Sequence, residues 1–536
     1  MWTQSDGSRR VSELLGYLLL FFVALNVVMT CLRQAKPEWL TALWLCAGAG
    51  WVLLCARRLE WTAWLLVAGL PIFGARPGDL VTNFQDCLIV GVAAVSLMRF
   101  PLRFGRPCPP LAGWVLVGVA LLSLLANAGR CFYPLRPLHQ DNVTRNLFFM
   151  FAGSWDIHIG AGEWFMLLNM LLVARCWYRL LAERPLRGGQ NGPSGRLRPE
   201  DFAAAVTVGF LAVLVLGYLE YFLPSVHGIV EAWQLRLYDF SDDTVNRWPL
   251  PAFLVSPVGP EVSMKSFFGN RGWFGQYLIA AGPVAMAWVA AKRAAWRRVC
   301  LGMLLGAWVL AVYLCGARAA ALAAVAGIVL LLLTLLLVRV SWRRRLKSSI
   351  AQWVIWLALV SLVPLPGLIY AVGPDWAWLD PHYRDIEWDK AVRLVRAHPW
   401  LGVGYETFGH AARTIEPPRG GPPQAVYITP HNLFAQTAAC TGLGGLLCVL
   451  LLFRVPIRAW TQFVARARLS PPEGASPQGT GLAFAFAMIF VCGFAQEWFY
   501  IRSLSLFFWL GLALLCALNP KAANRQPPAQ QMRDER

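Results

Sequence analysis

The chain has 536 residues, of which 57% are hydrophobic and only 14% are charged, and its formal net charge is +19. Soluble domains contain about 25% charged residues, so this composition excludes a soluble globular protein and predicts a polytopic membrane protein. The 13 cysteines are scattered and form no pair or Cys/His group with metal-ligand spacing. We therefore interpret them as packing residues and expect no metal site.

Apolar stretches recur along the chain, and about 14 of them are long enough to be placed as membrane spans. They cover residues 11–32, 38–56, 61–75, 80–98, 111–127, 161–181, 201–223, 271–291, 299–315, 317–338, 350–371, 432–453, 482–496 and 503–518. Arg9 and Arg10 precede the first span and place the N-terminus in the cytoplasm. The other basic residues then gather at the cytoplasmic ends of the spans, so the positive charge reflects topology and does not indicate nucleic-acid binding. Both termini are predicted to be cytoplasmic.

This topology divides the chain into alternating bundles and outer loops. The parts are an N-terminal transmembrane bundle (1–223), an outer loop (224–270), transmembrane helices (271–372), a long outer loop (373–431), C-terminal transmembrane helices (432–518) and a disordered cytoplasmic tail (519–536). The basic segment that starts at Arg454 is expected to be a cytoplasmic linker between two spans.

The long outer loop contains one helical pattern, over residues 382–397. Trp388, Ala391, Val392 and Val395 recur there at i, i+3, i+4 and i+7, which predicts an amphipathic helix. Such a helix would lie against the membrane surface or cap the bundle. The predicted fold is therefore an all-α polytopic membrane protein with a large outer loop that contains an amphipathic helix.

Three ionisable residues from distant parts of the sequence fall at the outer ends of predicted spans. Arg271 begins the eighth span, Arg318 lies in the hairpin between the ninth and tenth spans, and His431 precedes the twelfth. Two arginines suit a diphosphate, because guanidinium stays charged and binds phosphate oxygens bidentately. A histidine can accept a proton near neutral pH. These are the candidate catalytic residues for transfer of a group from a pyrophosphate, with the histidine deprotonating the acceptor hydroxyl.

Other interpretations of these positions remain open. Arg318 could extend its side chain to the outer headgroups, and His431 could simply start or pack a helix. Glu220, near the outer end of the seventh span, is costly in a membrane unless it is paired or faces water, and it could partner an arginine. Asp79 and Asp86 flank the start of the fourth span, where we expect them to be solvated or interfacial.

Four segments, NRGWFGQYL, CGARAAALA, HPWLGVGYETF and HNLFAQTAACTGLGGLL, resemble the O-antigen ligase/polymerase (Wzy-type) superfamily, whose members share this order of motifs. The resemblance covers roughly residues 269–452. It implies a GT-C-like glycosyltransferase of the bacterial inner membrane that uses a polyprenyl (undecaprenyl) pyrophosphate-linked glycan on the periplasmic face. It also implies a reaction that needs no metal or cofactor and inverts the anomeric centre.

At the matching positions, the resemblance makes His431 the proposed base and makes Arg271 and Arg318 the arginines that engage the lipid pyrophosphate. Where the family usually has a serine before the hairpin arginine, this chain has Ala317, which removes a hydroxyl donor but not the charge. Further residues are assigned to substrate binding. They are Arg384, which matches a loop arginine, and Asn432, Asn270 and Glu220.

The acceptor stays open within this enzyme class. A ligase moves a finished glycan onto lipid A-core, a polymerase extends a chain of repeat units, and a protein O-oligosaccharyltransferase modifies Ser or Thr. We favour the ligase. A polysaccharide transporter or flippase is the alternative from a different class, but the sequence has no internal repeat and its ionisable candidates gather at one face instead of the bilayer midplane.

Overall fold

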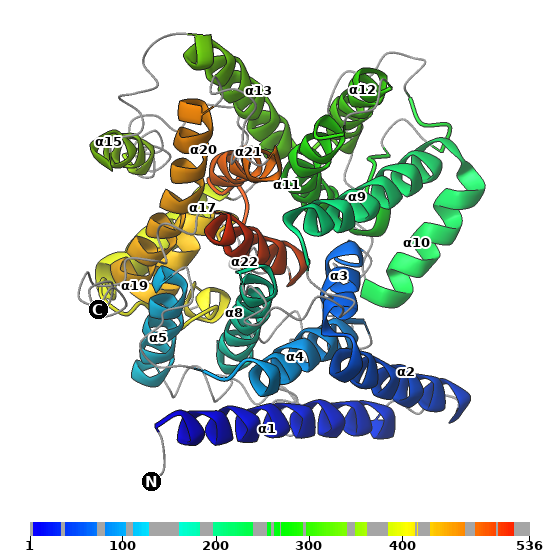
Figure 1. Ribbon diagram of the computed structural model, residues 1–536. Helices are drawn as coiled ribbons and strands as arrows, with labels where there is room; N and C mark the ends of the chain where they lie inside the picture. The colour runs from blue at the N-terminus through cyan, green and yellow to red at the C-terminus, as the bar shows by residue number, and fades with distance from the viewer. Residues whose placement is uncertain are drawn as a thin grey trace, which may run out of the picture.

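The computed structural model describes residues 4–33, 38–71, 81–102, 111–127, 160–182, 197–238, 255–258, 262–268, 270–292, 296–339, 349–361, 384–412, 415, 429–466, 477–499 and 502–518. Within these ranges every regular element is a helix, and the helices pack into a bundle (Figure 1). This confirms the prediction of an all-α fold.

The helices of the first half are α1 (Gln4–Arg33), α2 (Glu38–Arg57), α3 (Leu59–Ala68), α4 (Val81–Arg99), α5 (Leu111–Ala126), α8 (Gly160–Ala182), α9 (Pro199–Phe222) and α10 (Pro224–Tyr238). Those of the second half are η2 (Ser266–Phe268), α11 (Arg271–Ala290), α12 (Arg297–Cys315), α13 (Arg318–Arg339), α15 (Ser349–Val360), α17 (Arg384–Ala397), α18 (Phe408–Ala412), α19 (Leu433–Leu452), α20 (Arg454–Arg466), α21 (Pro477–Cys492) and α22 (Arg502–Ala517). Each stretch predicted to span the membrane overlaps one of these helices, and α17 is the helix predicted in the long outer loop.

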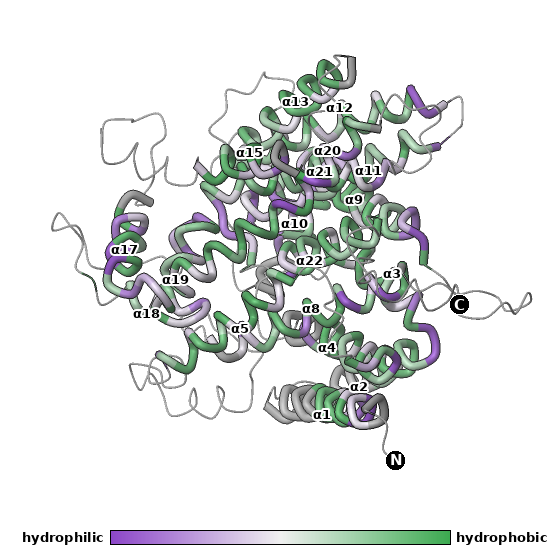
Figure 2. Tube along the Cα trace, turned by 60° about the vertical axis from the view of Figure 1, so that its left-hand side comes forward, coloured by the Kyte–Doolittle hydropathy of each residue, from purple (hydrophilic) through white to green (hydrophobic). Residues whose placement is uncertain are grey.

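Several helices are suited to a lipid environment. Among the described residues, five helical segments are long and apolar enough to cross a membrane, namely Gly162–Leu181, Pro199–Phe222, Arg297–Cys315, Arg318–Leu337 and Leu433–Ala465. Along α13, large apolar side chains are exposed over the whole length of the helix, among them Leu322, Val325, Val329, Leu332 and Leu336. Figure 2 shows the same apolar character on the neighbouring helices. This surface agrees with a helical membrane protein, and the count of about 14 spans stays a prediction.

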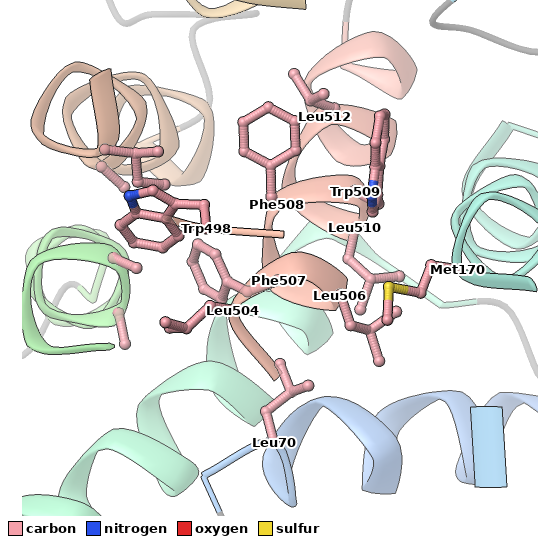
Figure 3. Close-up of a cluster of buried hydrophobic side chains, with 14 of the residues drawn as sticks. Leu70, Met170, Trp498, Leu504, Leu506, Phe507, Phe508, Trp509, Leu510 and Leu512 are labelled. Carbon is pink, nitrogen blue, oxygen red and sulfur yellow. The ribbon is translucent and has the colours of Figure 1, made fainter. Parts of the chain in front are cut away.

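Helix α22 lies at the centre of the bundle (Figure 1), and its side chains from Arg502 to Leu515 are all buried. It packs against α8, α20, α21 and α11. Phe507, Phe508 and Trp509 fill the space around it together with Trp498, which precedes the helix (Figure 3). A helix that is apolar all round is expected at such a central position, because every face meets another helix.

Two segments that were expected to be irregular contain helices. Residues 224–238 open the predicted outer loop and form α10, and the predicted linker after Arg454 opens with α20. Helix α20 packs on α21, and Trp460 donates its indole N–H to Thr334 Oγ1 at 2.8 Å. The arginines of α20 interrupt its apolar residues, so no apolar run marks the helix in the sequence. The predicted disordered tail, residues 519–536, lies outside the described residues.

Helix α19 has a kink at Gly442, where the backbone adopts φ 69° and ψ −173°. At this kink, two carbonyl oxygens of the helix accept hydrogen bonds from another part of the chain. Val403 N–H binds Ala439 O at 2.9 Å, and Gly404 N–H binds Cys440 O at 3.1 Å. The turn that follows α17 is thereby inserted into the kink, which joins two of the sequence motifs.

We expect Gly442→Ala to destabilise the protein by about 2 kcal/mol or more, because an added Cβ would lie 2.3 Å from the Trp400 carbonyl carbon at a positive φ. The matched control is Gly444→Ala, whose Cβ would meet its nearest neighbour, Trp400 O, at an ordinary 3.9 Å. Thermal unfolding of the purified variants in detergent measures the difference. Equal melting temperatures for the two variants would contradict this account of the kink.

Candidate active site

Arg271 is the first residue of α11, and its neighbour Asn270 caps the helix. Asn270 Oδ1 accepts hydrogen bonds from the backbone N–H groups of Gly272 at 2.7 Å and Trp273 at 3.4 Å. An asparagine cap of this kind satisfies two of the N–H groups that a helix start leaves without a partner. The half-buried arginine therefore stands at a fixed helix N-terminus, where the helix dipole adds to its positive charge.

The start of α11 packs directly against the hairpin that carries Arg318. Cys315 Sγ donates to Arg271 O at 3.2 Å, and a Cβ added at Gly275 would lie only 2.7 Å from Ala320 Cβ. Glycine permits this close approach because it has no side chain. The first turns of α11 and α13 are therefore neighbours, and Arg318 is exposed at the beginning of α13.

His431 immediately precedes α19, whose N-cap is Asn432. Asn432 Oδ1 accepts from the backbone N–H groups of Phe434 at 3.0 Å and Ala435 at 2.9 Å, the same pattern as in α11. His431 adopts the left-handed region with φ 48°, which is uncommon for a residue other than glycine. Its Nδ1 lies 3.0 Å from Glu497 Oε2, with side-chain exposures of 27% and 5%. An ionised carboxylate can only accept, so Nδ1 carries the hydrogen and Nε2 is the basic nitrogen.

The connection between α21 and α22, residues 493–499, holds both helix starts. Leu433 donates its backbone N–H to Gly493 O at 2.8 Å, and Gln276 of α11 donates its side-chain N–H to Glu497 O at 2.8 Å. The connection therefore joins the histidine end of α19 to the arginine end of α11.

The three candidate catalytic residues thus lie at helix starts that are linked by direct contacts. The helix starts that carry Arg271 and Arg318 are neighbours, because α11 packs against the α12–α13 hairpin. His431 joins them through the connection that both α11 and α19 contact.

The residues assigned to substrate binding have different surroundings. The side-chain oxygens of Asn270 and Asn432 cap helices, so these two residues position their neighbours. Glu220 is buried on α9 and accepts the backbone N–H of Ser266 at 2.5 Å, which ties α9 to the segment leading into α11. Arg384 is the first residue of α17. The assignment of all four to substrate binding stays a prediction.

Helix α17 positions the residue before the histidine. Trp388 donates its indole N–H to Pro430 O at 2.9 Å, while Ala391 and Leu394 are buried against α18 and α19. The helix lies with α18 at one edge of the molecule, beside α19 (Figure 2). The buried face of α17 therefore packs on α19 near Ala439 and Cys440, while Trp388 holds the residue before His431.

Residues 301–450 match the family model Wzy_C, described as O-antigen ligase. This match supports the resemblance to the O-antigen ligase/polymerase superfamily over these residues. A search of curated proteins found no match. The O-antigen ligase region runs from α12 to α19 and contains Arg318 and His431, but it ends before Glu497 and begins after Arg271. Arg271 and Glu497 lie outside the matched residues, and only the structure shows their contacts with this region.

The structure also shows a buried ion cluster beside the O-antigen ligase region that sequence reasoning missed. Arg502, at the start of α22, binds both carboxylate oxygens of Glu163 on α8 and lies 3.3 Å from Asp86 Oδ1 on α4. Asp86 is 1% exposed, so the expectation that it is solvated or interfacial was wrong. A single acid near the end of an apolar run was the available signal, and its partner could not be found because it lies 416 residues away.

Glu406, in the HPWLGVGYETF motif, is a second buried acid that the sequence did not single out. Its side-chain Oε2 accepts a hydrogen bond from Gln436, one turn into α19, and its backbone has φ 55°. Burial raises the pKa of the Glu406 carboxyl to about 8, and the negative charge of Glu163 adds to the rise while Arg502 opposes it. The carboxyl is therefore mostly protonated at neutral pH.

We expect Glu406→Gln to raise the melting temperature near pH 8 by about 3 °C or more. The unfolded chain releases this proton above its usual pKa of 4.5, whereas the folded chain holds it to about 8, so rising pH favours unfolding of the wild type across this window. The variant does not lose stability in this way, so the melting temperatures of the two proteins should become equal as the pH falls towards 4.5. Thermal unfolding from pH 4.5 to 8 measures it, with the exposed Glu200→Gln as control. A difference that is independent of pH would contradict the assignment.

Proposed function

We propose that the protein transfers a glycan from polyprenyl (undecaprenyl) pyrophosphate to a hydroxyl of lipid A-core, on the periplasmic face of the bacterial inner membrane. The observation that carries this proposal is that two arginines and a carboxylate-bound histidine stand at helix starts that contact one another or the same connection. The match of residues 301–450 to the O-antigen ligase family supports glycan and lipid-linked substrates in general.

In this proposal the arginines hold the pyrophosphate. Arg271 and Arg318 each begin a helix, so guanidinium charge and helix dipole act on the same anion. Bidentate hydrogen bonds fix the phosphate oxygens, and they strengthen as negative charge develops on the leaving group. In the proposed reaction, the arginines stabilise the negative charge of the pyrophosphate, as a metal ion does in other enzymes. The proposed reaction is therefore metal-independent.

His431 accepts the proton of the acceptor hydroxyl at Nε2, while Glu497 holds Nδ1–H and stabilises the imidazolium that forms. The acceptor oxygen then forms its bond to the anomeric carbon as the bond from that carbon to the pyrophosphate oxygen breaks. Attack opposite to the leaving group inverts the anomeric centre, and polyprenyl pyrophosphate departs from the arginines.

Both termini are cytoplasmic in the proposed topology, and the site faces the periplasm. Arg384, Asn270, Asn432 and Glu220 complete the proposed substrate-binding set, the last three by holding the helix starts in place. A repeat-unit polymerase or a protein O-oligosaccharyltransferase would use the same chemistry with another acceptor. A polysaccharide flippase would move the donor without consuming it.

The first test compares glycan transfer by the reconstituted wild type with that by His431→Ala, using polyprenyl-pyrophosphate-linked glycan and the three classes of acceptor. Removal of a general base should lower the rate by about 100-fold or more. The control is His398→Ala, because this histidine is exposed in the same outer segment. Full turnover by His431→Ala would exclude it as the base, and movement of the donor without transfer by the wild type would favour the flippase.

The second test replaces each arginine by lysine. Lysine keeps the charge but lacks the bidentate fork, so Arg271→Lys and Arg318→Lys should each reduce transfer by about 10-fold or more. Arg396→Lys, at an exposed position on α17, is the control and should be silent. If Arg318→Lys is silent as well, extension of this side chain to the headgroups is the better account of Arg318.

The third test is Glu497→Gln. The amide keeps a hydrogen-bond acceptor for Nδ1–H but loses the charge that stabilises the imidazolium, so kcat should fall about 10–100-fold with little change in the KM of the donor. Steady-state kinetics in proteoliposomes measures both constants. A rise in KM without a fall in kcat would show that Glu497 acts on the donor instead of the histidine.

A further inference from the structure

Gln496 lies between the two halves of the proposed site. Its backbone oxygen accepts the N–H of Leu433 at 3.2 Å, which fixes the residue at the start of α19. Its side chain reaches the start of α11, where Nε2 would be 3.5 Å and Cδ 3.8 Å from a Cβ added at Gly272. The amide therefore lies across the first turn of α11, next to Arg271, while the following residue, Glu497, binds the histidine.

The amide of Gln496 is also available, in contrast to the two other glutamines near the site. Gln276 donates to Glu497 O, and Gln436 donates to Glu406. Within the described part of the chain, the side chain of Gln496 makes no hydrogen bond, and the residue is partly exposed instead of buried. Because a partly exposed amide beside an arginine can exchange water for ligand oxygens, this position suits a ligand contact.

We propose that Gln496 is a positioning residue for the donor, and that its side-chain N–H groups bind an oxygen of the glycosyl pyrophosphate between Arg271 and His431. This inference rests on the proposed function. An amide offers two N–H donors and no charge, so it can orient the phosphate that carries the sugar without competing with the arginines for the anion. Fixing that oxygen aligns the anomeric carbon with the acceptor hydroxyl held by the histidine.

Gln496→Met and Gln496→Glu separate this role from a structural one. Methionine keeps the length of the side chain over Gly272 but removes the hydrogen bonds. Glutamate adds a negative charge at the start of α11 beside Arg271, which favours the fold but repels a pyrophosphate. A structural role would therefore preserve or improve the glutamate variant, whereas a donor-binding role would impair it.

The experiment measures the melting temperature of each variant and the inhibition of transfer by undecaprenyl pyrophosphate without a glycan. We expect both variants to melt at the wild-type temperature. The inhibition constant should rise about 10-fold or more, which is the loss expected when hydrogen bonds to a charged group are removed. The rise should be largest for Gln496→Glu. Wild-type inhibition of both variants would overturn the inference. If Gln496→Glu unfolds, Gln496→Met decides alone. A wild type that neither uses nor binds the polyprenyl pyrophosphate would instead overturn the proposed function.

Discussion

The geometry of the candidate site depends on the hydrogen bonds that the α21–α22 connection, residues 493–499, makes with two helix starts. It accepts the backbone N–H of Leu433 from α19 and the side-chain N–H of Gln276 from α11. The backbone N–H of Leu433 is one of the first N–H groups of α19, which have no partner inside the helix, so this outside acceptor both satisfies it and fixes the helix end. The bond from Gln276 holds α11 through a side chain. The spacing between the helix starts that carry Arg271 and His431 is therefore set by the connection between α21 and α22.

The buried ion cluster around Arg502 fixes those last helices in turn. Removing one arginine and two carboxylates from water costs free energy, which their mutual attraction and hydrogen bonds offset. Removing one partner would leave an unpaired buried charge, which costs free energy. The cluster therefore holds α22 against α4 and α8. The N-terminal half, which lies outside the family match, thus contributes to the site by holding the helix that follows the connection.

The sequence predicted the helices and the three principal residues because both leave local signals. Apolar runs mark helices in a membrane, and an arginine or histidine at the end of a run must lie near a surface. Contacts between side chains that are far apart in the sequence leave no such local signal. Glu497 meets His431 from 66 residues away, and Asp86 could be recognised as paired only once Arg502 was placed beside it. Helix α20 has no apolar run because arginines interrupt it, but Ile457, Trp460 and Val464 recur at i, i+3 and i+7, so helical periodicity was an available signal that was not used there.

The insertion of the turn after α17 into the kink of α19 has a consequence for how far the chain before His431 can vary in sequence. The chain between α17 and α19 is held there by the hydrogen bonds of Val403 and Gly404. It is held a second time where Trp388 binds Pro430 O, just before His431. Glu406 and α18 are buried between these two contacts, so a change in length or sequence that leaves His431 in place is expected only in residues 416–428. Doubling the length of such a stretch costs only about 0.6 kcal/mol in closure entropy, so insertions there are compatible with the fixed position of His431.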